Sequence, residues 1–146
     1  MNLSRTVSTL AAGLALMAGL AAAAPDITVY KNEGCGCCEL WIKYLEKNGF
    51  TVKAQNVPDT ATFRAKHGVP EKLGACHTAV VGGYAIEGHV PAREIQRLLA
   101  EKPKAKGLAV PGMPAGSPGM ESDRRQPFDV LLVRPDGTTA VFHSYR

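Results

Sequence analysis

The sequence predicts an α/β fold in which a central mixed β-sheet is flanked by helices. Two observations support this prediction. Segments with the alternating pattern of β-strands take turns along the chain with segments that have the apolar spacing of helices. In addition, two glycine-containing turns join pairs of apolar segments in the manner of β-hairpins. The sheet is therefore expected to contain antiparallel pairs beside the parallel pairs that helical crossovers produce.

The first half of this domain alternates strands and helices. A short β-branched strand at 27–30 runs into a turn at 32–34, and a helix follows over 38–48. Residues 50–56 alternate between apolar and polar side chains, which is typical of a half-buried strand. A second short helix ends at Gly68. The apolar residues that recur at helical spacing in the first helix are Leu40, Trp41, Tyr44 and Leu45.

The second half contains two predicted hairpins with a helix between them. The first hairpin spans 78–87 and turns at Gly82-Gly83, and Pro91 suits the first turn of a helix that runs to about Lys102. The C-terminal hairpin spans 130–143. This order of strands and helices is that of thioredoxin-like folds, in which a cysteine motif follows the first strand at the start of a helix.

A long segment at 103–127 is rich in proline and glycine and shows no periodicity. A loop of this length within a compact domain is usually functional or disordered. It carries two methionines, Met113 and Met120, whose thioethers are soft metal ligands. They are candidate outer or secondary ligands, and simple packing of the loop is the alternative.

The N-terminus has the pattern of a secretory signal peptide over residues 1–24. Arg5 precedes an apolar run at 10–20, and small residues follow as far as Pro25. The run is short for a transmembrane helix, although an uncleaved anchor is the alternative. Export to the periplasm of a Gram-negative cell, with a mature domain at 25–146 and no membrane association after cleavage, is the prediction.

The composition excludes some other functions. The formal net charge is +4, and the basic residues form no run and are not interleaved with aromatic residues, so nucleic-acid binding has no support. The sequence also contains no recognisable nucleophilic triad, phosphate-binding loop or carboxylate pair.

The four cysteines carry the chemical information in the sequence. Cys35, Cys37 and Cys38 lie together at the start of the first helix, where the helix dipole favours the thiolate form. In a thioredoxin-like fold the segment before the third strand approaches this corner, so Cys76 is expected to converge on the other three. His77 beside it is a candidate ligand or a hydrogen-bond partner of a thiolate, and an ordinary loop histidine is the alternative. His89 is expected to make a structural hydrogen bond.

Four converging thiolates suit a soft metal ion, with copper(I) and zinc as the leading candidates. Zinc sites usually draw their cysteines from two Cys-x-x-Cys pairs, and the second pair is missing here. Thiolates can bridge several copper(I) ions, which would allow a polynuclear cluster. Two alternatives remain: thiol–disulfide exchange by Cys35 and Cys38, and purely structural disulfides.

The same constellation, together with its surroundings, resembles a known family. The matching segments are Val29-Tyr30-Lys31, Gly34-Cys35-Gly36-Cys37-Cys38, Trp41, Gly49-Phe50, Gly68-Val69-Pro70, Ala75-Cys76-His77-Thr78-Ala79, Tyr84, Glu87-Gly88-His89-Val90-Pro91, residues 107–114 and residues 116–121. They resemble the small periplasmic proteins of the CopG type found in copper-resistance operons, a predicted metal-binding family.

This resemblance covers nearly the whole mature chain, and it implies more than the residues alone. It implies a thioredoxin-like fold and copper tolerance as the role, with copper oxidoreductase activity as one form that this role can take. The copper ligands that it implies are Cys35, Cys37, Cys38 and Cys76. Copper ions, and other periplasmic copper-handling proteins, are the expected partners.

Overall fold

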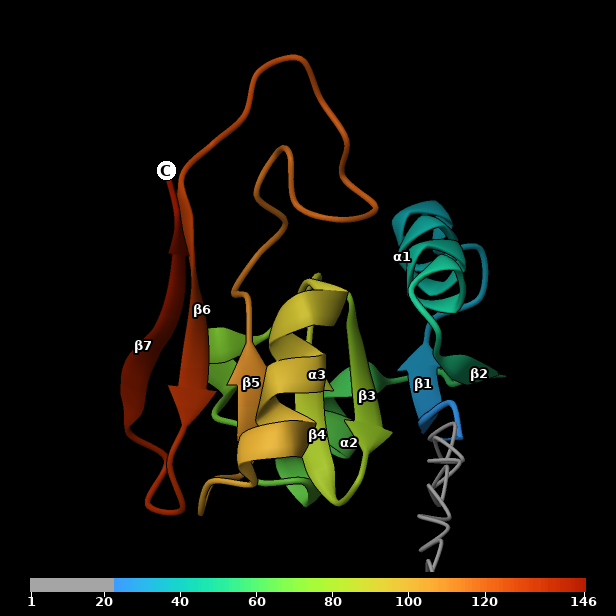
Figure 1. The fold of residues 1–146 in the computed structure, drawn as a ribbon. Coiled ribbons are helices and arrows are strands. Elements are labelled where there is room, and N and C mark those ends of the chain that lie inside the picture. The colour runs from blue at the N-terminus through green and yellow to red at the C-terminus, as the bar shows by residue number, and fades with distance from the viewer. Residues whose placement is uncertain (1–22) are drawn as a thin grey trace, which may run out of the picture.

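The computed structural model describes residues 23–146, which form a seven-stranded mixed β-sheet with helices on both faces (Figure 1). The predicted signal peptide, residues 1–24, lies outside the described residues except for its last two positions. In chain order the elements are β1 (Asp26–Lys31), α1 (Gly36–Lys47), β2 (Thr51–Asn56), α2 (Thr60–Lys66), the 3₁₀ helix η1 (Glu71–Leu73), β3 (His77–Val81), β4 (Tyr84–Glu87), α3 (Ala92–Glu101), β5 (Gly107–Ala109), β6 (Phe128–Val133) and β7 (Thr139–Tyr145).

The strand order across the sheet is β2-β1-β3-β4-β5-β6-β7. β1 pairs in parallel with β2 and antiparallel with β3, and β3 pairs antiparallel with β4. Both residues of the Gly82-Gly83 turn have positive φ values, +54° and +83°, as a tight two-residue hairpin requires. The predicted α/β class, with a mixed sheet and flanking helices, is confirmed.

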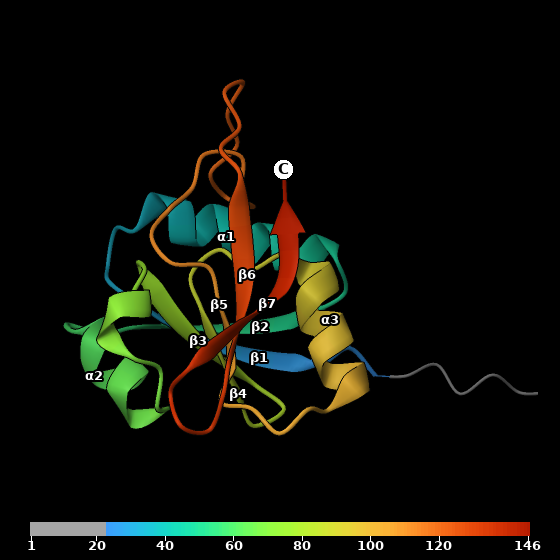
Figure 2. The ribbon, with the colours of Figure 1, turned by 90° about the vertical axis from the view of Figure 1, so that its left-hand side faces the viewer.

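Helices cover the sheet from opposite sides, and Figure 2 shows α2 and α3 on its two faces. Alternate residues of a strand point to opposite faces, and β4, β5 and β6 contribute to two cores in this way. The larger core contains the inward faces of α1 and α3, packed on strand residues such as Ile27, Ile86 and Leu108. The smaller core lies on the α2 side and includes Val69, Leu73, Ala85, Ala109 and Val133.

The predicted loop at 103–127 is shorter than expected, because β5 lies within it. β5 pairs in parallel with β4 and antiparallel with β6, and so joins the C-terminal hairpin to the rest of the sheet. Three residues are too few to show a periodicity, and Gly107 obscures the strand further. A Cβ at Gly107 would lie 1.7 Å from the backbone oxygen of Ala85, so only glycine allows this close pairing.

Within residues 23–146, no helix combines the length and the apolar character needed to cross a membrane.

Candidate metal centre

The start of α1 presents three of the four cysteines. β1 ends in a turn, Cys35 occupies the N-cap position, and Cys37 and Cys38 lie in the first helical turn. Cys38 is buried, whereas Cys35 and Cys37 are half-buried. The first turn of the helix thus presents three sulfurs close together.

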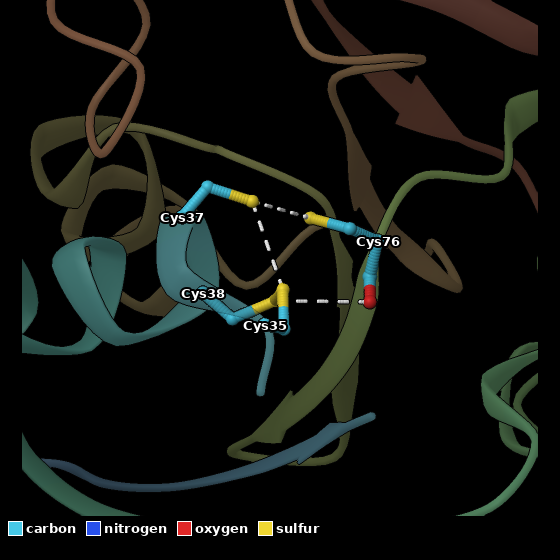
Figure 3. Close-up of side chains that lie close together, drawn as sticks. All are labelled: Cys35, Cys37, Cys38 and Cys76. Atoms are coloured by element: carbon cyan, nitrogen blue, oxygen red, sulfur yellow. Dashed lines mark hydrogen bonds between the residues drawn. A yellow bond between two sulfur atoms is a disulfide. The ribbon is translucent and has the colours of Figure 1, made fainter. Parts of the chain in front are cut away.

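Cys76 completes the cluster from a different part of the chain (Figure 3). Its Sγ lies 3.7 Å from Cys37 Sγ, which in turn lies 3.6 Å from Cys35 Sγ. All four sulfurs lie within 4.8 Å of one another, close enough to surround one or more metal ions. The structure thus brings together the four cysteines that the sequence singled out.

A disulfide joins Cys35 and Cys38, while Cys37 and Cys76 are free thiols. This pairing is the Cys-x-x-Cys pair at the helix start. The alternative in which all four cysteines form structural disulfides does not match this state, because Cys37 and Cys76 are free. In this oxidised state the cluster offers two thiols, and two further thiolates become available when the Cys35–Cys38 bond is reduced.

The free thiol of Cys76 is held in its protonated form. Burial, and after it the neighbouring Cys37, raise the pKa of Cys76 to about 12. A metal ion that binds here must displace the proton from this sulfur.

The two predicted methionines differ in their placement. Met113 Sδ lies 4.0 Å from Cys37 Sγ, and the side chain is 51% exposed. Met120 makes no sulfur contact with the cysteines within residues 23–146, although its backbone oxygen accepts a hydrogen bond from Gly116. Met113 is therefore the thioether that the structure brings to the thiols.

His89 lies at the same site, although its place in the sequence predicted only a structural hydrogen bond. That bond exists: His89 Nδ1 lies 2.7 Å from the backbone oxygen of Pro118. Its other ring nitrogen, Nε2, lies 3.0 Å from Cys76 Sγ. Because a carbonyl oxygen only accepts, Nδ1 carries the hydrogen in the neutral ring, and the lone pair of Nε2 faces the thiol.

The register of the predicted hairpin indicates the contact between His89 and Cys76. Thr78 pairs with Glu87 across the Gly82-Gly83 turn, so counting two residues further outward places Cys76 opposite His89. Burial lowers the pKa of His89, which favours the neutral ring that donates a lone pair.

His77 is fully buried, with its ring centroid 4.3 Å from that of Trp41. Its Nδ1 lies 3.4 Å from Cys76 Sγ, and its Nε2 has no hydrogen-bond partner within residues 23–146. Burial, reinforced by His89, lowers the pKa of His77 to about 3. Cys76, His77 and His89 form a second group of potential ligands that shares Cys76 with the cysteine cluster.

These features define a class of protein: an α/β domain in which a helix start and the segment before β3 carry a cluster of cysteines able to hold a soft metal. A family model described as a protein of unknown function, DUF411, matches residues 73–120, which include Cys76 and His89 but not the cysteines of α1. No curated protein sequence matches the chain.

Two solved structures match most of the chain. One is described as copper resistance protein copG, form 2, with 43% identity, a TM-score of 0.80, and coverage of 84% of this chain and 98% of that chain. The other is form 1 of the same protein, with 44% identity, a TM-score of 0.78, and coverage of 82% and 96% respectively. The chain belongs to the family of the copper resistance protein copG, which confirms the resemblance noted in the sequence.

Proposed function

We propose that this protein binds copper(I) in the periplasm through Cys35, Cys37, Cys38 and Cys76 and acts in copper resistance. The observation that carries the proposal is the position of Cys76 Sγ, 3.7 Å from Cys37 Sγ although the two residues are 39 positions apart in the sequence. A fold that needed only a Cys-x-x-Cys pair would not require a further thiol from the segment before β3.

The donor set around the cysteines favours copper(I) over zinc. Thiolate and thioether sulfurs are the ligands that copper(I) prefers, and Met113 Sδ lies at the edge of the cluster. His89 Nε2 adds a neutral imidazole nitrogen beside Cys76. Because thiolates can bridge metal ions, four sulfurs within 4.8 Å of one another suit a polynuclear copper cluster.

The Cys35–Cys38 disulfide adds a redox function to this proposal. When the reduced pair forms this bond, two electrons and two protons leave the two thiols. Two copper(II) ions can accept these electrons and become two copper(I) ions. The remaining thiols, Cys37 and Cys76, lie next to the new disulfide and can hold the copper(I) that is produced.

Export supports the choice of copper resistance as the role. The pattern of residues 1–24 is that of a cleaved signal peptide, and a disulfide at 35–38 persists most readily in an oxidising compartment such as the periplasm. The named neighbours are copper resistance proteins.

The test uses the mature protein, reduced under anaerobic conditions and titrated with copper(I) against a chelator of known affinity. We expect more than one copper per wild-type chain, and an affinity at least about tenfold lower in Cys76→Ser, equivalent to about 1.4 kcal/mol. Thermal unfolding of the copper-free variant checks that the fold is retained. Equal affinity in wild type and variant would contradict the role of Cys76.

A second candidate function is thiol–disulfide exchange, which the Cys35–Cys38 disulfide at the start of α1 specifically favours. In this reading the reduced pair attacks a protein disulfide and becomes oxidised. Rapid reduction of a protein disulfide with copper chelated, together with weak copper(I) binding, would favour it over the first function.

A further inference from the structure

A buried ion pair connects α2 to β4 on the α2 face of the sheet. Arg64 of α2 donates from Nε to Glu87 Oε1 of β4 over 2.9 Å. Glu87 is fully buried and Arg64 is nearly so. Neither residue touches the cysteine sulfurs, and the proposed copper chemistry makes no use of either.

The Glu87 carboxylate accepts hydrogen bonds from residues on both sides of Cys76. Its Oε1 also accepts a hydrogen bond from the Ala75 N–H over 2.7 Å, and its Oε2 accepts one from Thr78 Oγ1 over 2.6 Å. Arg64 in turn donates to the Ala75 carbonyl oxygen over 3.3 Å. Both backbone groups of Ala75, the residue directly before Cys76, are thus bound to the ion pair.

The neighbouring glycine shows how closely this arrangement is packed. A Cβ at Gly74 would lie 2.7 Å from the Arg64 guanidinium, so the glycine leaves room for the arginine to reach Ala75. β3 begins only at His77, so Cys76 lies just outside the hydrogen-bonded strand. The position of Cys76 therefore depends on side-chain contacts more than the position of a residue within the strand does.

The chemistry of the pair favours a positioning role over a purely stabilising one. Removing two charges from water costs free energy that their attraction only partly restores, and apolar residues of similar size often serve a core equally well. The network provides directed hydrogen bonds, and these end on the segment that carries Cys76.

We propose that Glu87 and Arg64 are positioning residues that keep Cys76 Sγ within reach of Cys37. The inference rests on the proposed use of Cys76 as a copper ligand. In that setting the pair acts as outer partners of a metal site do, by orienting a ligand without touching the metal.

The experiment compares Glu87→Gln with Glu94→Gln, a matched control. Glu94 is also a buried carboxylate, but it lies in α3 and accepts a hydrogen bond from Tyr145 Oη, not from the segment that carries Cys76. Thr78→Val is a milder second variant, since it removes one hydrogen bond to Glu87 and leaves the ion pair in place. It decides the matter if Glu87→Gln fails to fold.

Two quantities are measured on each variant. The first is the copper(I) affinity of the reduced protein, expected to fall roughly 10- to 100-fold in Glu87→Gln and by less in Thr78→Val. The second is the capture of phenylarsine oxide, which needs no copper, because this reagent binds two adjacent thiols with loss of water. In protein with the Cys35–Cys38 disulfide intact, capture reports whether Cys37 and Cys76 remain within bridging distance. We expect this capture to weaken in parallel and to be unchanged in Glu94→Gln.

The outcomes separate the two proposals. Unchanged arsenical capture and copper affinity in both variants would overturn the positioning role, while copper binding by the wild type would stand. An equal loss in Glu94→Gln would also overturn it, because the effect would then be one of general packing. Weakened capture in a protein whose wild type binds no copper would support positioning of Cys76 and refute the copper function.

Discussion

His89 gives Cys76 a partner that the sequence pattern did not predict. The Pro118 carbonyl oxygen holds the hydrogen on Nδ1 and leaves the Nε2 lone pair 3.0 Å from the sulfur. Histidine ligands commonly donate a hydrogen bond from the N–H of their second ring nitrogen to a carbonyl oxygen in this way, which orients the ring and fixes its tautomer. His89 is thus oriented to accept a hydrogen bond from the Cys76 thiol or to share a metal ion with Cys76.

We expect His89→Gln to lower the copper(I) affinity about tenfold, because the variant keeps a polar group but loses the imidazole nitrogen. His67→Gln is the control, since His67 is the C-cap residue of α2 and belongs to neither group of potential ligands found within residues 23–146. Competition with a copper(I) chelator measures both variants. An unchanged affinity in His89→Gln would exclude the ring from the copper site.

At the scale of elements, the segment at 110–127 packs against the start of α1 and brings Met113 to the cysteines. Gly119 forms the point of contact: a Cβ there would lie 2.8 Å from the Cys37 carbonyl oxygen and 2.9 Å from the Trp41 backbone nitrogen. A side chain at this position would push the segment away from the helix that carries three of the cysteines.

Gly119→Ala should therefore release copper(I) faster to a chelator than the wild type does. Gly112→Ala is the matched control, because its φ of +70° is similar to the +83° of Gly119 but nothing lies within 4 Å of its added Cβ. Both substitutions carry a backbone strain of about 1 kcal/mol or more. Equal release rates in the two variants would show that contact between the segment and α1 does not control access.

On the scale of the whole molecule, the buried histidines couple stability to pH. His77 takes part in the larger core beside Trp41, with its pKa lowered by burial from its ordinary 6.5 to about 3. Between these two values the unfolded chain binds a proton at this ring and the folded chain does not. Stability contributed by the neutral ring is complete above pH 6.5 and is lost as the pH falls towards 3.

We expect the free energy of unfolding of the copper-free protein to fall by roughly 1.5 kcal/mol from His77 alone between pH 6.5 and 5. His89 shifts in the same direction and adds to the loss. Chemical denaturation at a series of pH values measures the effect. A pH-independent stability in the wild type would contradict the burial of a neutral His77.

Much of the architecture follows from local patterns in the sequence. The spacing of Trp41 and Leu45 predicted α1, and the Gly82-Gly83 pair predicted the turn between β3 and β4. These features depend on periodicity and turn chemistry, which neighbouring residues express directly. The convergence of Cys76 on the α1 cysteines was also predictable, because the order of elements implies which segments meet.

Other features depended on contacts between distant residues. β5 is a strand only because β4 and β6 lie on either side of it. Met113 rather than Met120 meets the thiols because of the path of the loop. Arg64 meets Glu87 because α2 packs on β3, the strand beside β4. The sequence alone therefore determined the α/β class and the choice of the four cysteines. The tertiary structure decided which side chains surround them, since burial and hydrogen-bond partners arise only when separate segments pack together.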